Sequence, residues 1–322
     1  MSEMVEEKSI ADAALHTPAS SASSASASPG AIWAGMIVIY IVWGSSYLAM
    51  RFAIQTMPPF LMAAARFLIA GSVLYAWQRL SRQAAPTRRQ WRSALIVGLF
   101  LLLGGNGLVV WAEQRIPSGI AALLVGSTPL WMALIDGLRQ RRLPSWQAIL
   151  GILIGLIGIT VLIGPSQLTG LHGDIDLIGA AAVTLAALSW AAGSLYSRSA
   201  DLPKSPFLYN GMEMLCGGAA LLLLGTLTGE WGRVQLGAIS SASWLGFAYL
   251  VIFGSLIGFS TYTWLLRSAP TTLVSTYAYV NPVVAVVMGN LLAQEPLTPR
   301  VILAAVVIIA GVLLITLGRS RK

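Results

Sequence analysis

From residue 31 onward, the chain alternates between long apolar runs and short polar stretches that hold most of its charged residues. A helix needs about 20 residues to cross a bilayer core of about 30 Å. Ten apolar runs reach about this length, so the pattern predicts an all-α membrane protein with ten transmembrane helices. The predicted spans are 32–50, 60–80, 93–112, 119–138, 146–164, 177–197, 206–228, 244–266, 271–293 and 301–318.

Residues 1–30 do not share this pattern. They are acidic at first and then rich in serine and alanine, without apolar periodicity. Such a segment cannot bury enough apolar surface to fold, so we predict a disordered cytoplasmic tail. The first apolar run begins at Ala31 without a positively charged region before it, which argues against a secretory signal peptide.

The composition supports a membrane protein. Apolar residues make up 56% of the chain and charged residues only 10%, which is outside the range of ordinary soluble domains. The single cysteine, Cys216, lies in an apolar run and excludes an internal disulfide and a cysteine-ligated metal cluster. Its simplest interpretation is a small buried apolar residue.

Basic residues are distributed unevenly between the two sets of loops. The loops after the second and fourth spans are rich in arginine, whereas the opposite set holds only Arg51, Arg115, Arg233 and Arg300. Because lysine and arginine concentrate in cytoplasmic loops, we predict that both termini are cytoplasmic. The excess of basic residues is therefore a topology signal, and nucleic acid is not expected as a partner.

The second half of the chain repeats anchor residues of the first half. Trp111, Pro117 and Pro129 recur 153 positions later as Trp264, Pro270 and Pro282, and a second set that includes Trp43 and Arg66 recurs 147 positions later, with Trp190 and Glu213 at the matching positions. We predict two domains after the tail, at 31–165 and 175–318, with five spans each. An odd number of spans inverts the second half, which places a substrate site near the midplane between the halves.

Four segments resemble a known group of membrane proteins: YIVWGSSYLAMR (40–51), GNGLVVWAEQRIPSGIAA (105–122), SWAAGSLYSR (189–198) and STYAYVNPVVAV (275–286). Together they resemble the drug/metabolite transporter superfamily, its EamA-domain family and the YedA-like group of inner-membrane permeases. The resemblance covers residues 31–318. It implies two EamA repeats, ten helices in a 5+5 inverted repeat, a multi-pass inner-membrane protein, and export of small metabolites such as amino acids, sugars or drugs.

Two ionisable residues, Arg66 and Glu213, lie well inside predicted spans at matching positions of the repeats. Charged groups are expensive inside a membrane and are functional candidates by default. Arg66 would hold a substrate carboxylate, and Glu213 an amine or a proton. The alternative is that each only satisfies a neighbouring helix. Burial favours protonation of Glu213, and a nearby Arg66 would oppose it by forming a fixed ion pair.

Polar and aromatic residues complete the candidate substrate site. Asn106 lies in a glycine-rich run, where it would line a cavity or make one interhelical hydrogen bond. Aromatic rings at mid-span could stack on a flat or cationic ligand. The further candidates for binding substrate are Trp43, Ser46, Trp190, Tyr277 and Asn281.

Two prolines, Pro129 and Pro282, occupy matching positions in the fourth and ninth spans. Proline removes a helical hydrogen bond, and irregular backbone at membrane depth is tolerated where it lines a cavity. We predict that both prolines interrupt their helices and act as the hinges of two gating helices. A packing kink without a ligand is the alternative for either one.

The sequence therefore favours a secondary transporter over an enzyme. It has no GxxxxGK[ST] loop for ATP, no metal-ligand spacing and no GxSxG elbow, so we expect no cofactor and no metal. A passive facilitator, an uptake permease and a channel are the alternatives within transport; a membrane-embedded transferase is the alternative enzyme. The expected partners are a small-molecule substrate and the lipid bilayer, with protons as a further candidate, in a monomer or homodimer.

Overall fold

The computed structural model describes residues 28–140, 146–163, 176–269, 271–274 and 276–319. These residues form helices and no strand. The predicted tail lies outside the described residues except at its end, where Ser28 caps the first helix and Pro29 begins it. The helical membrane protein predicted from the apolar runs is confirmed.

The first repeat contains α2 (Pro29–Ala53), α3 (Pro59–Leu80), α4 (Arg88–Gly98), η1 (Leu99–Gly107), α5 (Leu108–Ala112), α6 (Ser118–Val125), α7 (Thr128–Gln140) and α8 (Trp146–Ile163). The second contains α10 (Leu177–Ser197), α11 (Pro206–Leu227), η2 (Glu230–Arg233), η3 (Leu236–Ala238), α12 (Ser241–Tyr249), η4 (Leu250–Ile257), α13 (Gly258–Ser268), α14 (Thr271–Val274), α15 (Tyr277–Ala293) and α16 (Pro299–Arg319). The stretches η1 and η4 are π-helical and continue the α-helices on either side of them.

Seven helical runs in the described residues are long and apolar enough to cross a membrane. Three shorter apolar helices, Ile149–Leu162, Tyr277–Ala293 and Pro299–Leu314, fall on the remaining predicted spans. Each predicted span thus coincides with helix, because backbone in lipid must satisfy its own hydrogen bonds.

Short polar side chains and prolines set where the helices begin. Thr87 and Gln90 form a capping box at the start of α4. The carboxylate of Asp176 accepts from the N–H of Gly179 at 2.7 Å and caps α10. That hydrogen bond, with help from Arg115, lowers the pKa of the partly exposed Asp176.

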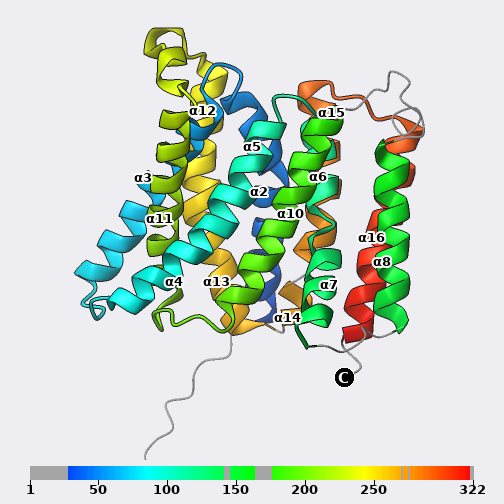
Figure 1. Ribbon diagram of the computed structural model, residues 1–322, viewed down its shortest axis with the longest axis horizontal. Helices are drawn as coiled ribbons and strands as arrows, with labels where there is room; N and C mark the ends of the chain where they lie inside the picture. The colour runs from blue at the N-terminus through cyan, green and yellow to red at the C-terminus, as the bar shows by residue number, and fades with distance from the viewer. Residues whose placement is uncertain (1–27, 141–145, 164–175, 270, 275, 320–322) are drawn as a thin grey trace, which may run out of the picture.

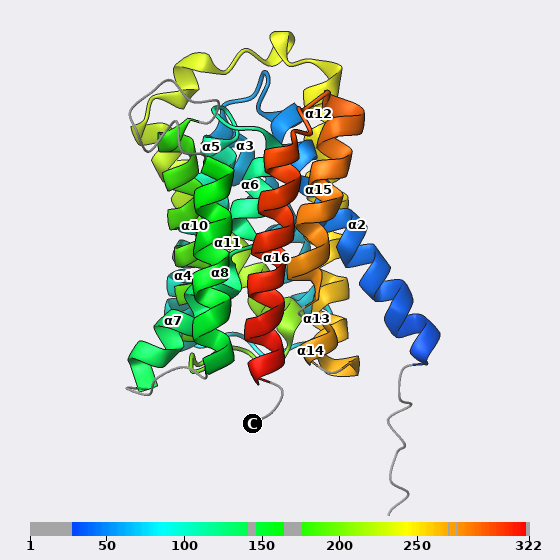
Figure 2. The same ribbon diagram turned by 90° about the vertical axis from the view of Figure 1, so that its right-hand side faces the viewer.

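The bundle has two ends. The first turn of α2 and the last turn of α16 lie at the same end, and so does the turn between α3 and α4 (Figures 1 and 2). We call this the terminal end. The opposite end, where α2 and α15 finish and α3 and α6 start, we call the far end.

The two repeats pack against each other through matching helices. The most extensive contacts join α3 to α11 and α8 to α16, which are the second and fifth helices of the two repeats. In Figure 2, α8 and α16 lie side by side along the bundle. A Cβ atom added to Gly311 of α16 would lie 2.7 Å from the main-chain oxygen of Gly151 and from the nitrogen of Gly155. These glycines therefore let the two backbones touch.

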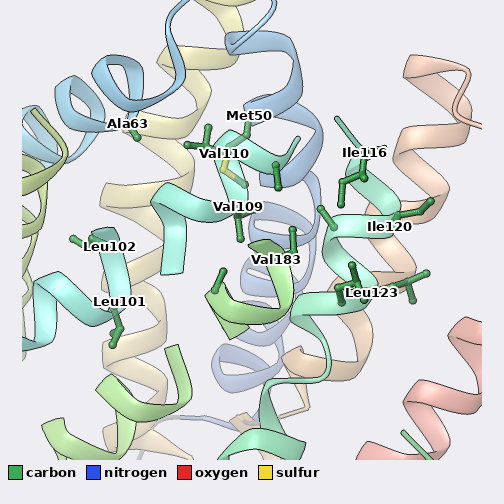
Figure 3. Packing of buried hydrophobic residues seen from close by; sticks show 14 of the residues in the cluster. Met50, Ala63, Leu101, Leu102, Val109, Val110, Ile116, Ile120, Leu123 and Val183 are labelled. Atoms are coloured by element: carbon green, nitrogen blue, oxygen red, sulfur yellow. The ribbon is translucent and has the colours of Figure 1, made fainter. Parts of the chain in front are cut away.

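The apolar core also runs across the repeats. Leu101, Leu102, Val109 and Val110 of the third helical run are buried in one cluster with Val183 of α10 (Figure 3). The first helix of the second repeat thus packs against the third run of the first repeat, so neither half has a closed core of its own.

The two predicted helix interruptions have different outcomes. The fourth span breaks between α6 and α7, two residues before Pro129, which lies in the first turn of α7. The interruption expected at Pro282 is wrong, since α15 runs through this residue and the break precedes it, between α14 and α15. The helix tolerates Pro282 because packing against α2 and α6 holds α15 in place.

Substituting Gly311 by alanine should destabilise the protein by about 1–3 kcal/mol, because the new methyl group meets main-chain atoms that cannot rotate away. Thermal unfolding in detergent measures the change. The matched control is Gly30→Ala in α2, where an added Cβ meets nothing within 4 Å and the expected change is within about 0.5 kcal/mol. Equal effects of the two substitutions would contradict the close approach of α8 and α16.

Candidate functional site

An aromatic cluster lies where α2, α13 and α15 meet. The ring of Trp43 is 5.5 Å from Phe259, 5.0 Å from Tyr262 and 5.1 Å from Tyr277, measured between ring centroids. Tyr262 and Tyr277 are in turn 5.7 Å apart, edge to face. These separations suit favourable aromatic contacts. The structure therefore brings together Trp43 and Tyr277, two of the candidates that the sequence places in different repeats.

A polar layer lies beside this cluster, around η4. Arg66 is only 5% exposed, and its Nε donates to the hydroxyl of Ser255 at 2.9 Å. A Cβ atom on Gly254 would lie 3.1 Å from Nη2 of Arg66 and 3.2 Å from the hydroxyl of Ser46. The absence of a side chain at Gly254 thus lets both polar groups reach the backbone of η4.

The remaining candidates lie around η1 and α15. Trp190 covers Gly105, where an added Cβ would lie 2.9 Å from the indole ring, and Asn106 is the next residue of η1. Asn281 is buried beside Gly44 of α2, and its Oδ1 has no hydrogen-bond partner among the described residues. Pro282 packs against Gly126, at the break between α6 and α7.

The two π-helical stretches occupy matching positions and receive matching hydrogen bonds. The indole N–H of Trp43 donates to the main-chain oxygen of Gly254 at 3.3 Å. The hydroxyl of Ser189, next to Trp190, donates to the main-chain oxygen of Phe100 at 2.7 Å. Each donor lies on the first helix of one repeat and each acceptor on the third helical run of the other. π-Helical turns disturb the regular backbone pattern and are frequent at functional sites.

Carboxylates at the far end tie the repeats together in the same crosswise manner. Glu295, just after α15, accepts from the N–H and the hydroxyl of Ser118, both at 2.8 Å, and from the N–H of Gly119 at 3.0 Å. Glu230, just after α11, accepts from the N–H of Leu61 at 2.9 Å and of Phe60 at 3.3 Å. Both carboxylates thus cap a first-repeat helix from the end of its second-repeat counterpart.

Arg51 completes the far-end cluster. Its Nε lies 3.3 Å from Oε1 of Glu295, and its Nη1 donates to the main-chain oxygen of Ile116 at 3.2 Å and, more weakly, to that of Glu113 at 3.4 Å. The Glu113 side chain is 2% exposed, and neither of its oxygens has a hydrogen-bond partner in the described part of the chain. One arginine therefore joins the ends of α2, α5 and α15.

A model of the EamA-like transporter family matches residues 28–164 and 177–317. The chain belongs to this family. It is 38% identical, over 293 residues, to "Uncharacterized inner membrane transporter YedA" of Escherichia coli (strain K12), covering 89% of this chain and 91% of that protein. "Uncharacterized transporter YoaV" of Bacillus subtilis (strain 168) is 26% identical over 297 residues, with 89% and 97% covered. One crystal structure has the same fold, with a TM-score of 0.61 at 24% identity and 91% and 99% covered.

The two EamA repeats and the membrane-transporter class inferred from the resemblance are thus confirmed. The proximity considered for Arg66 and Glu213 is not found. Neither residue belongs to any of the four ion pairs between described residues, and Arg66 interacts electrostatically with Glu113 instead. The reason is inversion: Arg66 lies seven residues from the far end of α3, whereas Glu213 lies seven residues from the terminal end of α11.

Glu213 nevertheless remains a buried carboxyl group. It is 3% exposed, and its Oε1 has no hydrogen-bond partner among the residues described. The third run of the first repeat passes close to it, since a Cβ added to Gly98 would lie 2.8 Å from the main-chain oxygen of Glu213. Its surroundings are therefore those of an unpaired group inside the bundle.

Sequence reasoning missed the far-end residues Glu113, Glu230, Glu295 and Arg51. The three acids lie in different loops, so their spacing along the chain does not show that they meet, and Arg51 was used only to predict the topology. One signal could have found two of them: Glu230 and Glu295 each follow the last residue of a helix by two or three positions. In an inverted repeat, the end of a helix in the second half lies beside the start of its counterpart in the first half, so an acid placed there can cap that start.

Replacing Glu295 by alanine should destabilise the protein by about 1–3 kcal/mol, because two main-chain N–H groups lose their acceptor. The unfolding midpoint in detergent reports the loss. Asp201→Ala is the control, since Asp201 is half exposed, pairs with the exposed Arg89, and should change stability by less than about 1 kcal/mol. An unchanged midpoint for Glu295→Ala would show that the cap contributes nothing.

Proposed function

We propose that the protein is a secondary transporter of the inner membrane that exports small metabolites by alternating access. Membership of the EamA-like transporter family supports the transport of a small molecule. The name of the Escherichia coli relative refers to the inner membrane, and we extend this location to the present chain. Amino acids and related polar or amphipathic compounds, drugs included, are the substrate classes we propose.

The observation that carries the mechanism is the crosswise contact between repeats. Trp43 and Ser189 each bind the π-helical stretch of the opposite repeat, so the substrate region lies between the halves and belongs to neither. Inverted repeats that rock against each other expose such a region to one side at a time. The gating role of Pro129 and Pro282 is part of this proposal. Pro129 follows the break between α6 and α7, and Pro282 packs against Gly126 at the same break.

Arg66 and the aromatic cluster provide complementary chemistry for one substrate. The guanidinium can bind a carboxylate with two parallel hydrogen bonds, and in the described part of the chain its Nε donates to one serine hydroxyl. The faces of Trp43 and the neighbouring tyrosines can receive a flat or cationic group. A small zwitterionic or amphipathic solute fits both features, and Ser46, Asn106, Trp190, Tyr277 and Asn281 are proposed as further lining residues.

We also propose ten crossings with both termini in the cytoplasm. The common position of the first turn of α2 and the last turn of α16 supports an even number of crossings (Figure 2), and the arginine-rich turn between α3 and α4 at that end supports its cytoplasmic location. Each repeat then has five crossings, and the second is inverted relative to the first.

A reporter enzyme that is active only in the periplasm tests this topology. A reporter fused after Lys322 should be inactive, and one inserted after Gly232 should be active. Gly232 lies in the far-end segment after α11, and a Cβ atom added to it would meet nothing within 4 Å. The reverse result would show that the far end, and not the terminal end, faces the cytoplasm. Two active fusions would place both sites on the same side of the membrane and would exclude the three crossings that we propose between Gly232 and the C-terminus.

Arg66→Gln should reduce export about tenfold or more, because a hydrogen bond to a charged group contributes about 1.5–3 kcal/mol and 1.4 kcal/mol corresponds to about tenfold. Trp43→Ala should reduce export by a similar factor, because it removes an aromatic face whose contact with a desolvated cation contributes about 2 kcal/mol. A metabolite library measured in the medium of an overexpressing strain identifies the exported compound and gives its rate. The controls are Arg89→Gln and Trp231→Ala, which alter exposed side chains. Parental export by Arg66→Gln, at equal protein abundance, would exclude the arginine as the substrate anchor.

A further inference from the structure

We propose that Glu113 is a proton-binding site that takes up one proton when the far end closes and releases it when the far end opens. This inference rests on the alternating access proposed above and adds a ligand to it. It starts from the one side chain in the far-end cluster whose polar atoms are both left without a partner in the described chain.

The surroundings of Glu113 disfavour a charged carboxylate. The side chain is 2% exposed, and an ionised carboxylate out of water needs hydrogen-bond donors that none of the described residues supplies. Glu113 is also the C-cap of α5, where the free carbonyl groups carry the negative end of the helix dipole. Removing the negative charge by protonation relieves both effects.

The charged groups that face Glu113 come from three elements. Arg51 of α2 and Arg66 of α3 attract its negative form, whereas Glu295, after α15, repels it. Tyr47 of α2 is a further titratable neighbour. Arg51 already pairs with Glu295 and gives its other hydrogen bonds to main-chain oxygens, and Arg66 donates to Ser255. Neither arginine therefore solvates the Glu113 carboxylate in this conformation.

A proton fits this position better than any larger cation. The two oxygens are shielded from solvent, and the described residues contain no group of three or more His, Cys, Asp or Glu that could hold a metal ion. A metal or an ammonium group needs several ligands and its own volume, whereas a proton needs one oxygen atom.

Opening of the far end changes the partners of Glu113. Glu295 holds α15 to the start of α6 and to Arg51, so separating α15 from α6 and α2 frees the guanidinium of Arg51. This group already lies against the main chain of Glu113 and becomes available to its carboxylate as water enters. Glu113 then loses its proton to the far side and pairs with Arg51.

The sign of the pH dependence follows from linkage. The closed far end binds the proton more tightly than the open one, so lowering the pH favours the closed form and raising it favours the open form. One proton changes the ratio of the two forms by up to about tenfold per pH unit. Acid on the far side of the membrane therefore stabilises the closed form of the far end.

Spin labels across the far end test this proposal without a known substrate. Cysteines replace Gln114 and Leu297, which are exposed, in a Cys216→Ala background, and the distance distribution is measured in nanodiscs from about pH 5 to about pH 9. We expect a short distance at low pH and a longer one at high pH. Glu113→Gln, a permanent neutral mimic, should keep the short distance throughout.

Glu213→Gln is the matched control, because it makes the same exchange at the other buried carboxyl group with an unpartnered oxygen. It should retain the parental pH response. Loss of the response in Glu213→Gln but not in Glu113→Gln, or a parent that does not respond to pH, would overturn the proposal. Two distance populations with a ratio independent of pH would refute the proton site while leaving alternating access intact.

A second measurement covers the case in which Glu113→Gln does not fold. In the Glu213→Gln protein, infrared spectra at neutral pH should contain the carbonyl absorption of a protonated carboxylic acid, and it should disappear at high pH as the far end opens. If no such absorption is present at neutral pH, Glu113 is ionised in the closed state and the proposal is wrong.

Discussion

The bilayer leaves no water for a backbone group that lacks a hydrogen bond, and this constraint governs the structure of the protein. Regular helix satisfies it within each span. The exceptions are helix starts and the two π-helical stretches, where main-chain groups need partners from elsewhere. Glu295 and Glu230 supply acceptors at the starts of α6 and α3, and Ser189 and Trp43 supply donors to η1 and η4.

All four of these partners come from the opposite repeat. Each half therefore depends on the other to satisfy its own irregular backbone, in addition to burying its apolar surface. An alternating-access movement cannot simply separate the halves, because separation would leave polar groups unsatisfied in lipid. It has to exchange one set of crosswise bonds for another. In the present conformation the far-end set is formed, with Arg51 joining α2, α5 and α15.

Three buried polar side chains, Glu113, Glu213 and Asn281, have an atom without a partner among the described residues. Such groups destabilise a bundle by about 1–3 kcal/mol each, and we have proposed functional roles for Asn281 and Glu113 that would offset this cost. Asn281 is proposed to line the substrate region. Glu113 lies outside the aromatic and polar layer and is better placed to sense the state of the far end.

The sequence alone determined the helical spans and the repeat, because both depend on local patterns of residues. Apolar runs of bilayer length specify helices because lipid forbids other backbone, and recurring anchors such as Trp43 and Trp190 revealed the repeat that the family match confirms. The distances between anchors along the chain could not show which residues meet. That Arg66 faces Ser255 and Glu113 while Glu213 lies near the opposite end, and that Glu295 caps α6, was decided only by the tertiary structure. Inversion and crosswise packing set the contacts of Arg66 with Ser255 and of Glu295 with α6, because they bring together residues that are more than a hundred positions apart.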